Sequence, residues 1–139
     1  MRTMTLIDFF SKDQFAASAG VRLTCVREGY AEAEMRIGPQ VLNASGWVQG
    51  GALFTLADLT FAAAVNTHGP LTVSANSHIA FFSSAREGTL HATARELVDH
   101  RRLPYGEVRI TDGDGHLIAL FTSSGYRKSN ATIEVDSLM

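Results

Sequence analysis

One carboxylate lies within the most apolar stretch of this chain of 139 residues. Asp58 is part of VQGGALFTLADLTFAAAVNT, residues 48–67, in which almost every other side chain is apolar or small. A carboxylate buried without a partner is strongly destabilising or takes up a proton, so packing alone rarely explains one. Burial also raises the pKa of a carboxyl group and makes its anion a stronger base. Asp58 is therefore a candidate general base or nucleophile.

Two glycines, Gly50 and Gly51, open the same stretch. The first N–H groups of a helix have no carbonyl partner within the helix, and they attract an anion or a developing negative charge. Glycines leave those groups accessible, which indicates an oxyanion or anion site. The same pair could instead serve only to let the helix pack closely against its neighbours. The residues alone leave both interpretations open.

Residues 48–67 predict one long helix. Apolar and small side chains recur at steps of three and four residues, the spacing of one helical face: Leu53, Leu56, Ala57, Thr60, Phe61 and Ala64. The other faces are also apolar or small, which is typical of a buried helix, and the charge of Asp58 favours a core helix over a membrane span. Such a helix needs cover on nearly every side, part of which a second subunit could provide.

The segments around this helix predict an antiparallel sheet. In residues 30–37 apolar and charged side chains alternate, which indicates a strand with one face toward a core. The Asp112-Gly-Asp-Gly115 turn between two apolar runs is a hairpin signal. The expected strands cover residues 21–27, 30–37, 71–84, 89–98, 105–111 and 116–127. One long helix among antiparallel strands predicts an α+β fold in which the sheet wraps the helix.

The two ends of the chain are expected to be simple. Residues 5–17 predict a short amphipathic helix with Gly20 as its stop; it could pack on the sheet or act as a lid over a pocket. Residues 1–128 are expected to form a single domain. Residues 129–139 are expected to form a polar, frayed tail, in which residues 132–135 could still pair as a strand.

The composition fits a compact domain without a nucleic-acid partner. Apolar residues make up 45% and charged residues 19% of the chain, and the net charge is −2. The single cysteine, Cys25, excludes an internal disulfide and fits a reducing compartment. No signal peptide or membrane span is recognisable, so we expect a cytoplasmic protein that has no membrane partner.

Other residues give weaker signals of chemistry. The five histidines are scattered, and no pair has the spacing of zinc ligands, so we expect no metal and no other cofactor. No serine lies in a nucleophile-elbow motif. The basic pair Arg101-Arg102 could grip a phosphate group or belong to a solvated loop. The same two interpretations apply to Arg127-Lys128.

The motif around the helix start resembles that of a known family. Asn43-x-x-Gly46-x-x-Gln49-Gly50-Gly51, followed by an aspartate eight residues after Gly50, is similar to the signature of the hotdog-fold acyl-CoA thioesterases. The likeness is to the branch that includes the phenylacetate-pathway thioesterase and thioesterase-superfamily member 2, and it spans residues 30–127. The resemblance implies a helix wrapped by a strongly curved antiparallel sheet. It also implies hydrolysis of an acyl- or aroyl-CoA to a free acid and CoA.

The resemblance further implies a role for each matched residue. Asp58 corresponds to the catalytic carboxylate, a general base or nucleophile, and Gly50 to the residue whose backbone N–H polarises the thioester carbonyl. Asn43 corresponds to an asparagine that positions substrate or catalytic groups, and Ser74 to a strand serine that holds the attacking water. At Gln49 the chain departs from the family, which usually has histidine there. An amide can donate a hydrogen bond but carries no proton in the physiological range.

The spacing of Gly50 and Asp58 predicts a site shared by two subunits. At a rise of about 1.5 Å per residue they lie about 12 Å apart along one helix, too far for one thioester carbon to contact both. An antiparallel partner helix would set Asp58 of one chain opposite Gly50 of the other. The resemblance likewise implies a homodimer, often paired again into a tetramer.

The residues do not identify the acyl group. We expect the substrate to contact Gly51, Phe54, Phe81 and Phe82. Phe61 is a further candidate, although phenylalanines equally form cores. Two other functions remain open. An enoyl-thioester hydratase would use a histidine with a carboxylate, and no histidine occurs before His68. A non-catalytic acyl-CoA-binding domain would keep the pocket and the glycines but would not need a base.

Overall fold

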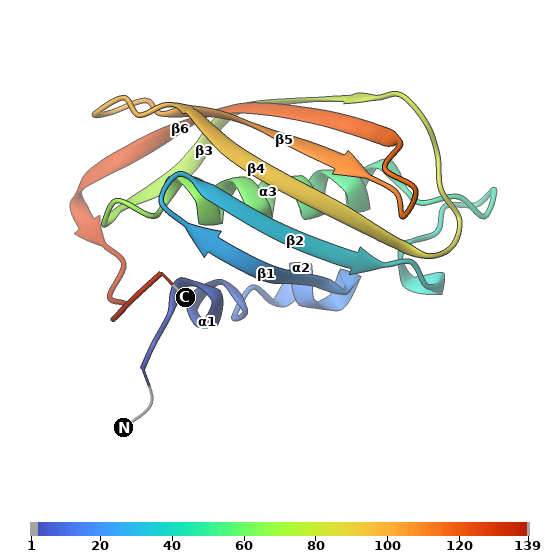
Figure 1. Cartoon of the computed structure of the whole chain (residues 1–139), viewed down its shortest axis with the longest axis horizontal. Coiled ribbons are helices and arrows are strands. Elements are labelled where there is room, and N and C mark those ends of the chain that lie inside the picture. Colours follow the sequence, from blue (N-terminus) through green and yellow to red (C-terminus); the bar gives the residue numbers. More distant parts are fainter. Residues whose placement is uncertain (1–2, 139) are drawn as a thin grey trace.

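The computed structural model describes residues 3–138, so the outermost residues of the expected domain and tail, 1–2 and 139, lie outside it. Its main feature is one antiparallel sheet of six strands that curls over a single long helix, α3 (Gly50–Val65) (Figure 1). The strand order is β1-β2-β4-β5-β6-β3, and α3 contacts all six strands. The predicted α+β fold, a helix wrapped by a curved sheet, is confirmed.

The remaining elements follow the sequence closely. The strands are β1 (Val21–Arg27), β2 (Tyr30–Arg36), β3 (Pro70–Phe81), β4 (Thr89–Val98), β5 (Tyr105–Thr111) and β6 (Leu117–Thr132). The short helical segments are α1 (Leu6–Phe10), α2 (Gln14–Ala19) and the 3-10 turn η1 (Pro39–Val41). β1, β4 and β5 have the predicted bounds, whereas β3 ends earlier than expected.

The core lies between α3 and the concave face of the sheet. Ala33 and Ala92, which pair across β2 and β4, are buried and small, so the sheet can approach the helix closely. Phe61 of α3 and Phe121 of β6 fill the wider space beside them, with ring centroids 5.9 Å apart. Close packing of this kind ties the position of the helix to the curvature of the sheet.

α3 is buried on most of its surface but not on all of it. One stripe with three- and four-residue spacing stays half-buried or exposed, and this open stripe consists of Gly50, Gly51, Phe54, Thr55, Asp58 and Ala62. The helix is apolar on almost every side, as expected, yet one chain alone leaves this stripe uncovered. With 16 residues α3 is the longest described helix, and none in residues 3–138 is long and apolar enough to cross a membrane.

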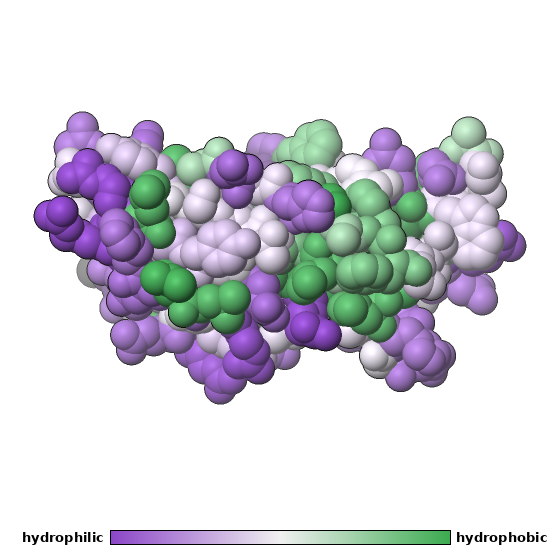
Figure 2. All heavy atoms as spheres, turned by 90° about the horizontal axis from the view of Figure 1, so that it is seen from above, coloured by the Kyte–Doolittle hydropathy of each residue, from purple (hydrophilic) through white to green (hydrophobic). Residues whose placement is uncertain are grey.

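β3 forms one edge of the sheet. It pairs with β6 on one side, no described strand lies on the other, and only Thr72 among its residues is buried. Figure 2 shows a large apolar patch on the face above the second half of β3. Phe81, the last residue of β3, and Phe82 after it are 52% and 58% exposed. A long exposed edge strand pairs readily with another strand, so this edge is available to a second chain.

The N-terminal segment differs from the single helix expected over residues 5–17. Thr5 and Asp8 form a capping box that starts α1. Asp13 then caps α2 by accepting a hydrogen bond from a backbone N–H of that helix at 2.9 Å. Two successive N-caps therefore divide the segment into two short helices. Gly20, the expected stop, ends α2 in the left-handed region, with φ of 88°.

The C-terminal segment is more ordered than the frayed tail that we expected. β6 continues to Thr132, beyond the predicted end of this strand. Ile133 is buried and its N–H donates to Gly69 O, and the N–H of Asp136 donates to Met4 O. The tail thus fastens the start of the chain and the loop before β3 to the domain, because its backbone groups find partners there.

Gly106 lies where β5 passes close to both β4 and α3. A methyl group at this position would lie 2.7 Å from the carbonyl oxygen of Arg95 and 3.2 Å from the ring of Phe61. We expect Gly106→Ala to lower the free energy of unfolding by about 1–3 kcal/mol, the usual effect of overpacking. Urea denaturation at fixed protein concentration measures this change. Gly113→Ala is the control, since a methyl group there meets no atom within 4 Å; equal losses in both variants would contradict the explanation.

Candidate active site

Asp58, on the open stripe of α3, forms a polar pair with Ser74. Ser74, on the edge strand β3, donates a hydrogen bond from Oγ to Asp58 Oδ1 at 2.7 Å. Asp58 is half-buried and Ser74 is exposed, so the pair lies at the surface of the chain rather than in its core. One chain therefore brings together two of the residues predicted for catalysis.

The surroundings of Asp58 raise the pKa of its carboxyl group above the ordinary value. Burial is the main cause, since it disfavours the charged form. The hydrogen bond from Ser74 acts in the opposite direction, and the negative charge of Asp13 raises the pKa further. A half-buried carboxylate that still accepts a hydrogen bond combines raised basicity with access to its ionised form, as a general base requires.

A buried asparagine places Ser74 next to Asp58. Asn66, directly after α3, accepts a hydrogen bond from the N–H of Thr72 at 2.8 Å. Its side-chain amide donates to the carbonyl oxygens of Ala62 and Thr72 at 2.8 and 2.9 Å. The end of the helix is thereby fixed to the start of β3. No role was predicted for Asn66 from the sequence, although an asparagine near the end of a predicted helix is a signal for a cap.

A β-bulge in β3 decides which side chains face α3. Directly after Ser74 the register with β6 shifts, which makes Ala75 an extra residue in the strand. Side chains alternate between the two faces of a regular strand, so Ser74 and Phe81, an odd number of residues apart, would lie on opposite faces. With the bulge, Ser74 contacts Asp58 while the ring of Phe81 lies against Gly50, and both therefore face α3.

The start of α3 carries the second group of predicted residues. Gln49 precedes the helix in an extended conformation, and its side chain folds across Gly51. A methyl group at Gly50 would lie 3.1 Å from Phe81 Cζ, so this ring closes one side of the helix start. The N–H groups of the two glycines precede that of Ala52, which bonds to Gln49 O at 2.9 Å. They are the donors expected for an oxyanion.

A cleft of about 580 Å³ opens beside the helix start. Its lining comes from α2, η1 and the first turns of α3, and includes Phe15, Ala19, Leu42, Gln49, Gly51 and Thr55. Phe15 is 73% exposed. The cleft has the size of a small-molecule site, and it contains two of the predicted site residues, Gln49 and Gly51.

The phenylalanines considered for an acyl pocket separate into two groups. Phe61 is fully buried and belongs to the core. Phe54 is half-buried on the open stripe and makes an edge-to-face contact with Phe121, with ring centroids 5.3 Å apart. Phe81 and Phe82 are exposed at the end of β3. Phe54, Phe81 and Phe82 therefore remain accessible to a ligand, whereas Phe61 does not.

Asn43 builds the loop before the helix. Its side-chain oxygen accepts hydrogen bonds from the N–H groups of Ser45 and Trp47 at 2.9 and 3.1 Å, and its own N–H donates to Trp47 O. Gly46 completes the turn in the left-handed region, with φ of 83°. These contacts give Asn43 a structural role, and its contact with substrate stays a prediction.

Arg101 and Arg102 lie in residues 99–104, the β4–β5 loop, where both are exposed. Arg127, the other basic candidate, is different. Its side chain is only 9% exposed, and its guanidinium pairs with two carboxylates at 2.9 and 3.3 Å. The interpretation of Arg127 as a free phosphate ligand is therefore wrong, because its charge is already neutralised inside the protein.

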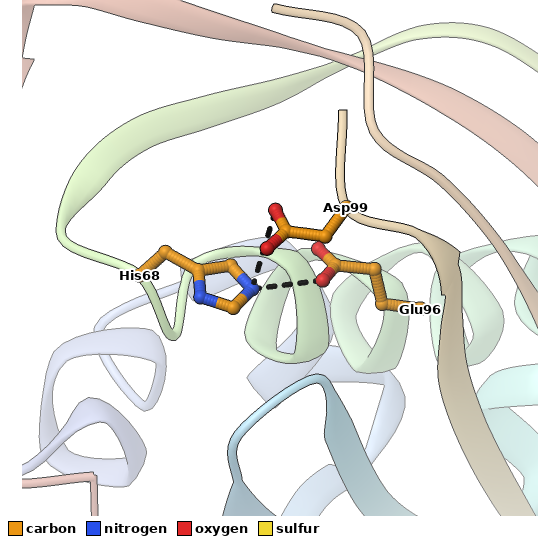
Figure 3. Close-up of side chains that lie close together, drawn as sticks. All are labelled: His68, Glu96 and Asp99. Carbon is orange, nitrogen blue, oxygen red and sulfur yellow. Dashed lines mark hydrogen bonds and ion pairs between the residues drawn. The ribbon is translucent and has the colours of Figure 1, made fainter. Parts of the chain in front are cut away.

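Two clusters in the described residues combine histidine with carboxylates, namely His68, Glu96 and Asp99, and Asp112, Asp114 and His116. In the first, His68 Nε2 lies 2.8 Å from Glu96 Oε1 and 3.7 Å from Asp99 Oδ1 (Figure 3). Arg127 also pairs with both of these carboxylates. In the second, Asp112 accepts hydrogen bonds from the backbone of its own turn. Ion pairs and turn hydrogen bonds thus account for both clusters.

The predicted residues form two half-sites in one chain. The first half-site contains Gln49, Gly50 and Phe81 at the start of α3, and the second contains Asp58 and Ser74 near its middle. About two turns of helix, or about 12 Å along the axis, separate Gly50 from Asp58, so one chain does not bring them to a common atom. Both half-sites open onto the same uncovered stripe.

Known proteins share this sequence pattern. A family model described as the thioesterase superfamily matches residues 45–119, more than half of the chain. The acyl-coenzyme A thioesterase PaaI of Escherichia coli K12 is 30% identical over 119 residues, which cover 85% of this chain and 85% of that protein.

Solved structures share the fold as well. The E. coli PaaI protein from the phenylacetic acid degradation operon has a TM-score of 0.85 at 29% identity, with 91% of both chains covered. A mutant of the phenylacetic acid degradation protein PaaI from Thermus thermophilus has a TM-score of 0.78 at 30% identity, with 82% of this chain and 98% of that chain covered. The matched region includes Gly50, Asp58 and Ser74, and the chain belongs to the thioesterase superfamily, a family of thioester hydrolases.

Proposed function

We propose that the protein hydrolyses an acyl- or aroyl-CoA thioester to a free acid and CoA. The Asp58–Ser74 pair is the observation that supports this most directly, because it places a carboxylate of raised pKa on an accessible face. The same face carries the helix-start N–H of Gly50. The similar protein PaaI is named an acyl-coenzyme A thioesterase, which supports CoA as the carrier of the acyl group.

In the proposed reaction Asp58 removes a proton from water while the water attacks the thioester carbon, and Ser74 helps to hold the water. Negative charge then builds on the carbonyl oxygen, where the N–H of Gly50 stabilises it. Loss of one such donor typically lowers the rate about 10²–10³-fold. The carbon–sulfur bond then breaks, and the CoA sulfur leaves with the proton that Asp58 removed from water. Direct attack by the Asp58 carboxylate, followed by hydrolysis of the anhydride, would use the same groups.

We propose further that each active site combines the half-sites of two subunits. A second copy placed antiparallel along the open stripe would set Asp58 of one protomer against Gly50 of the partner subunit. The free edge of β3 provides backbone groups with which a second sheet can pair. Such a partner would also bury Phe54 and its neighbours on the stripe. Two-fold symmetry then gives two equal sites in each dimer.

The alternative functions have less support from the site. A hydratase would use an imidazole beside the carboxylate, whereas the hydrogen-bond partner of Asp58 is the hydroxyl of Ser74. A domain that only binds acyl-CoA would not require a carboxylate of raised pKa at the centre of the open stripe. Hydrolysis uses both of these features.

Asp58→Asn keeps the size of the side chain and removes its basicity and nucleophilicity. We expect kcat for a panel of acyl-CoA substrates to fall by at least about 100-fold, the usual contribution of a general base. Release of the CoA thiol measures the rate, and circular dichroism checks the fold. Asp114→Asn removes the same charge from an exposed turn and is the control. A wild-type kcat in the Asp58 variant would show that this residue is not the base.

The pH dependence of kcat/KM reports the ionisation of Asp58. Because the base must be ionised, activity falls as the pH drops through its pKa. Ser74→Ala removes the hydrogen bond that lowers this pKa, so the acidic limb should move to higher pH. Asp13→Asn removes a negative charge that raises the pKa and keeps a capping side chain, so the limb should move to lower pH. Shifts in the same direction would contradict this account.

Subunit exchange tests the shared site. Gly50→Pro removes the N–H donor, and proline is tolerated at the first position of a helix. When it is mixed with Asp58→Asn, each heterodimer should contain one site built from two wild-type halves and should regain the activity of that site. Heterodimers without recovery, or a stable monomer with full activity, would exclude the arrangement.

Gly50→Ala is the matched control for the proline variant. It introduces the same contact with Phe81 as any side chain at this position, but it keeps the N–H donor. A large loss in Gly50→Pro together with a small one in Gly50→Ala would therefore separate the effect of the donor from the effect of crowding.

A further inference from the structure

Arg127 organises the β4–β5 loop. Its Nη1 donates to Asp99 Oδ1 at 2.9 Å and to His100 O at 3.0 Å, and its backbone N–H donates to Arg102 O at 2.8 Å. Within the loop, His100 Nδ1 accepts hydrogen bonds from the N–H groups of Arg102 and Leu103 at 3.0 and 2.8 Å. With these partners the loop is a fixed turn rather than a loose connection.

The inner part of this anchor is a network of ion pairs and hydrogen bonds, of which Figure 3 shows His68, Glu96 and Asp99. The side chain of Glu96 is only 4% exposed, and it pairs with Arg127 Nη2 at 3.3 Å and with His68 Nε2 at 2.8 Å. Asp99, whose side chain is 58% exposed, forms the surface end of the network. Breaking a buried pair leaves an uncompensated charge, so the network holds β4, β6 and the turn after α3 together.

In this arrangement the negative charge of the loop is paired and its two positive charges are exposed. The carboxylate of Asp99 is paired with Arg127, whereas Arg101 and Arg102 are exposed. Within residues 3–138, Arg101 has no ion-pair partner, and the guanidinium of Arg102 reaches only the hydroxyl of Tyr126 at 3.4 Å. Two exposed guanidinium groups on an anchored turn are suited to phosphate groups, which accept paired N–H donors.

The same anchor connects the loop to the strand of the proposed active site. Arg127 pairs across the sheet with Thr72, which lies two residues before Ser74. Thr72 is in turn bound to Asn66 at the end of α3. The position of the loop is therefore fixed relative to Ser74 and its partner Asp58.

On the basis of the proposed acyl-CoA hydrolysis, we propose that Asp99 and Arg127 are positioning residues that hold Arg101 and Arg102 for the phosphate groups of CoA. Arg127 does not itself bind phosphate, since its charge is neutralised by two carboxylates. A preformed turn increases affinity because less freedom is lost on binding. The effect concerns binding and not the chemical step, so it changes KM and leaves kcat unchanged.

Two substitutions at Asp99 separate position from charge. Asp99→Ala and Asp99→Asn remove the same negative charge, but only asparagine keeps a side-chain oxygen that accepts from Arg127. With an acyl-CoA substrate, we expect Asp99→Ala to raise KM about tenfold, the effect of one charge-assisted hydrogen bond, while Asp99→Asn stays near wild type. If only charge mattered, both variants would lower KM, because removing an acid beside two arginines favours an anionic ligand.

A truncated substrate provides the second measurement. The N-acetylcysteamine thioester of the same acyl group lacks phosphates, so neither Asp99 variant should change its kcat or KM. Adding Asp99→Ala to the double variant Arg101→Ala/Arg102→Ala should raise KM for acyl-CoA no further, since the positioned groups are already absent.

An unchanged or lowered KM for acyl-CoA in Asp99→Ala overturns the inference. An equal rise in Asp99→Asn, or a loss of activity on the truncated thioester, also overturns it. These results require a wild-type protein that hydrolyses thioesters. A wild-type protein that hydrolyses neither substrate would instead overturn the proposed function, so the two failures are distinguishable.

Discussion

The structure depends on one constraint. Its apolar helix must be covered, and it must also keep one carboxylate within reach of water. α3 is apolar or small on almost every face, and burial of apolar surface is the main driving force for folding. A flat sheet would cover only one side of the helix, so the sheet curls. The strand order leaves β3 at the edge. Cover by the chain ends there, and Asp58 meets a serine hydroxyl and solvent instead of more core.

The elements with strong local signals could be predicted from the sequence. Alternating side chains marked β2, an Asp-Gly turn marked the hairpin of β5 and β6, and continuous apolar spacing marked α3. Asp58 was recognisable because a charge within such a helix conflicts with packing. The N-terminal segment was predicted as one helix because its apolar spacing continues through it. Asp13 interrupts the helix as an N-cap, which periodicity does not reveal.

The geometry of the site depends on residues that are distant in sequence, and it could not be predicted in the same way. Asn66 holds the strand of Ser74 only because the chain turns back onto the helix it has just left. Asp13 affects the pKa of Asp58 only because α2 packs beside α3. Arg127 resembles a surface cation in the sequence and becomes an internal ion-pair residue in the fold. Such roles arise from tertiary contacts, which composition and spacing do not contain.

The bulge at Ala75 makes the length of β3 part of the site. Insertion of one residue between Ser74 and Phe81 would turn either the hydroxyl or the ring away from α3, whereas deletion of one residue can be absorbed by loss of the bulge. Relatives of this chain that keep both contacts should therefore have either the bulge or one residue fewer in this segment. The turn at residues 112–115, on the surface between β5 and β6, has no such requirement and can change its length freely.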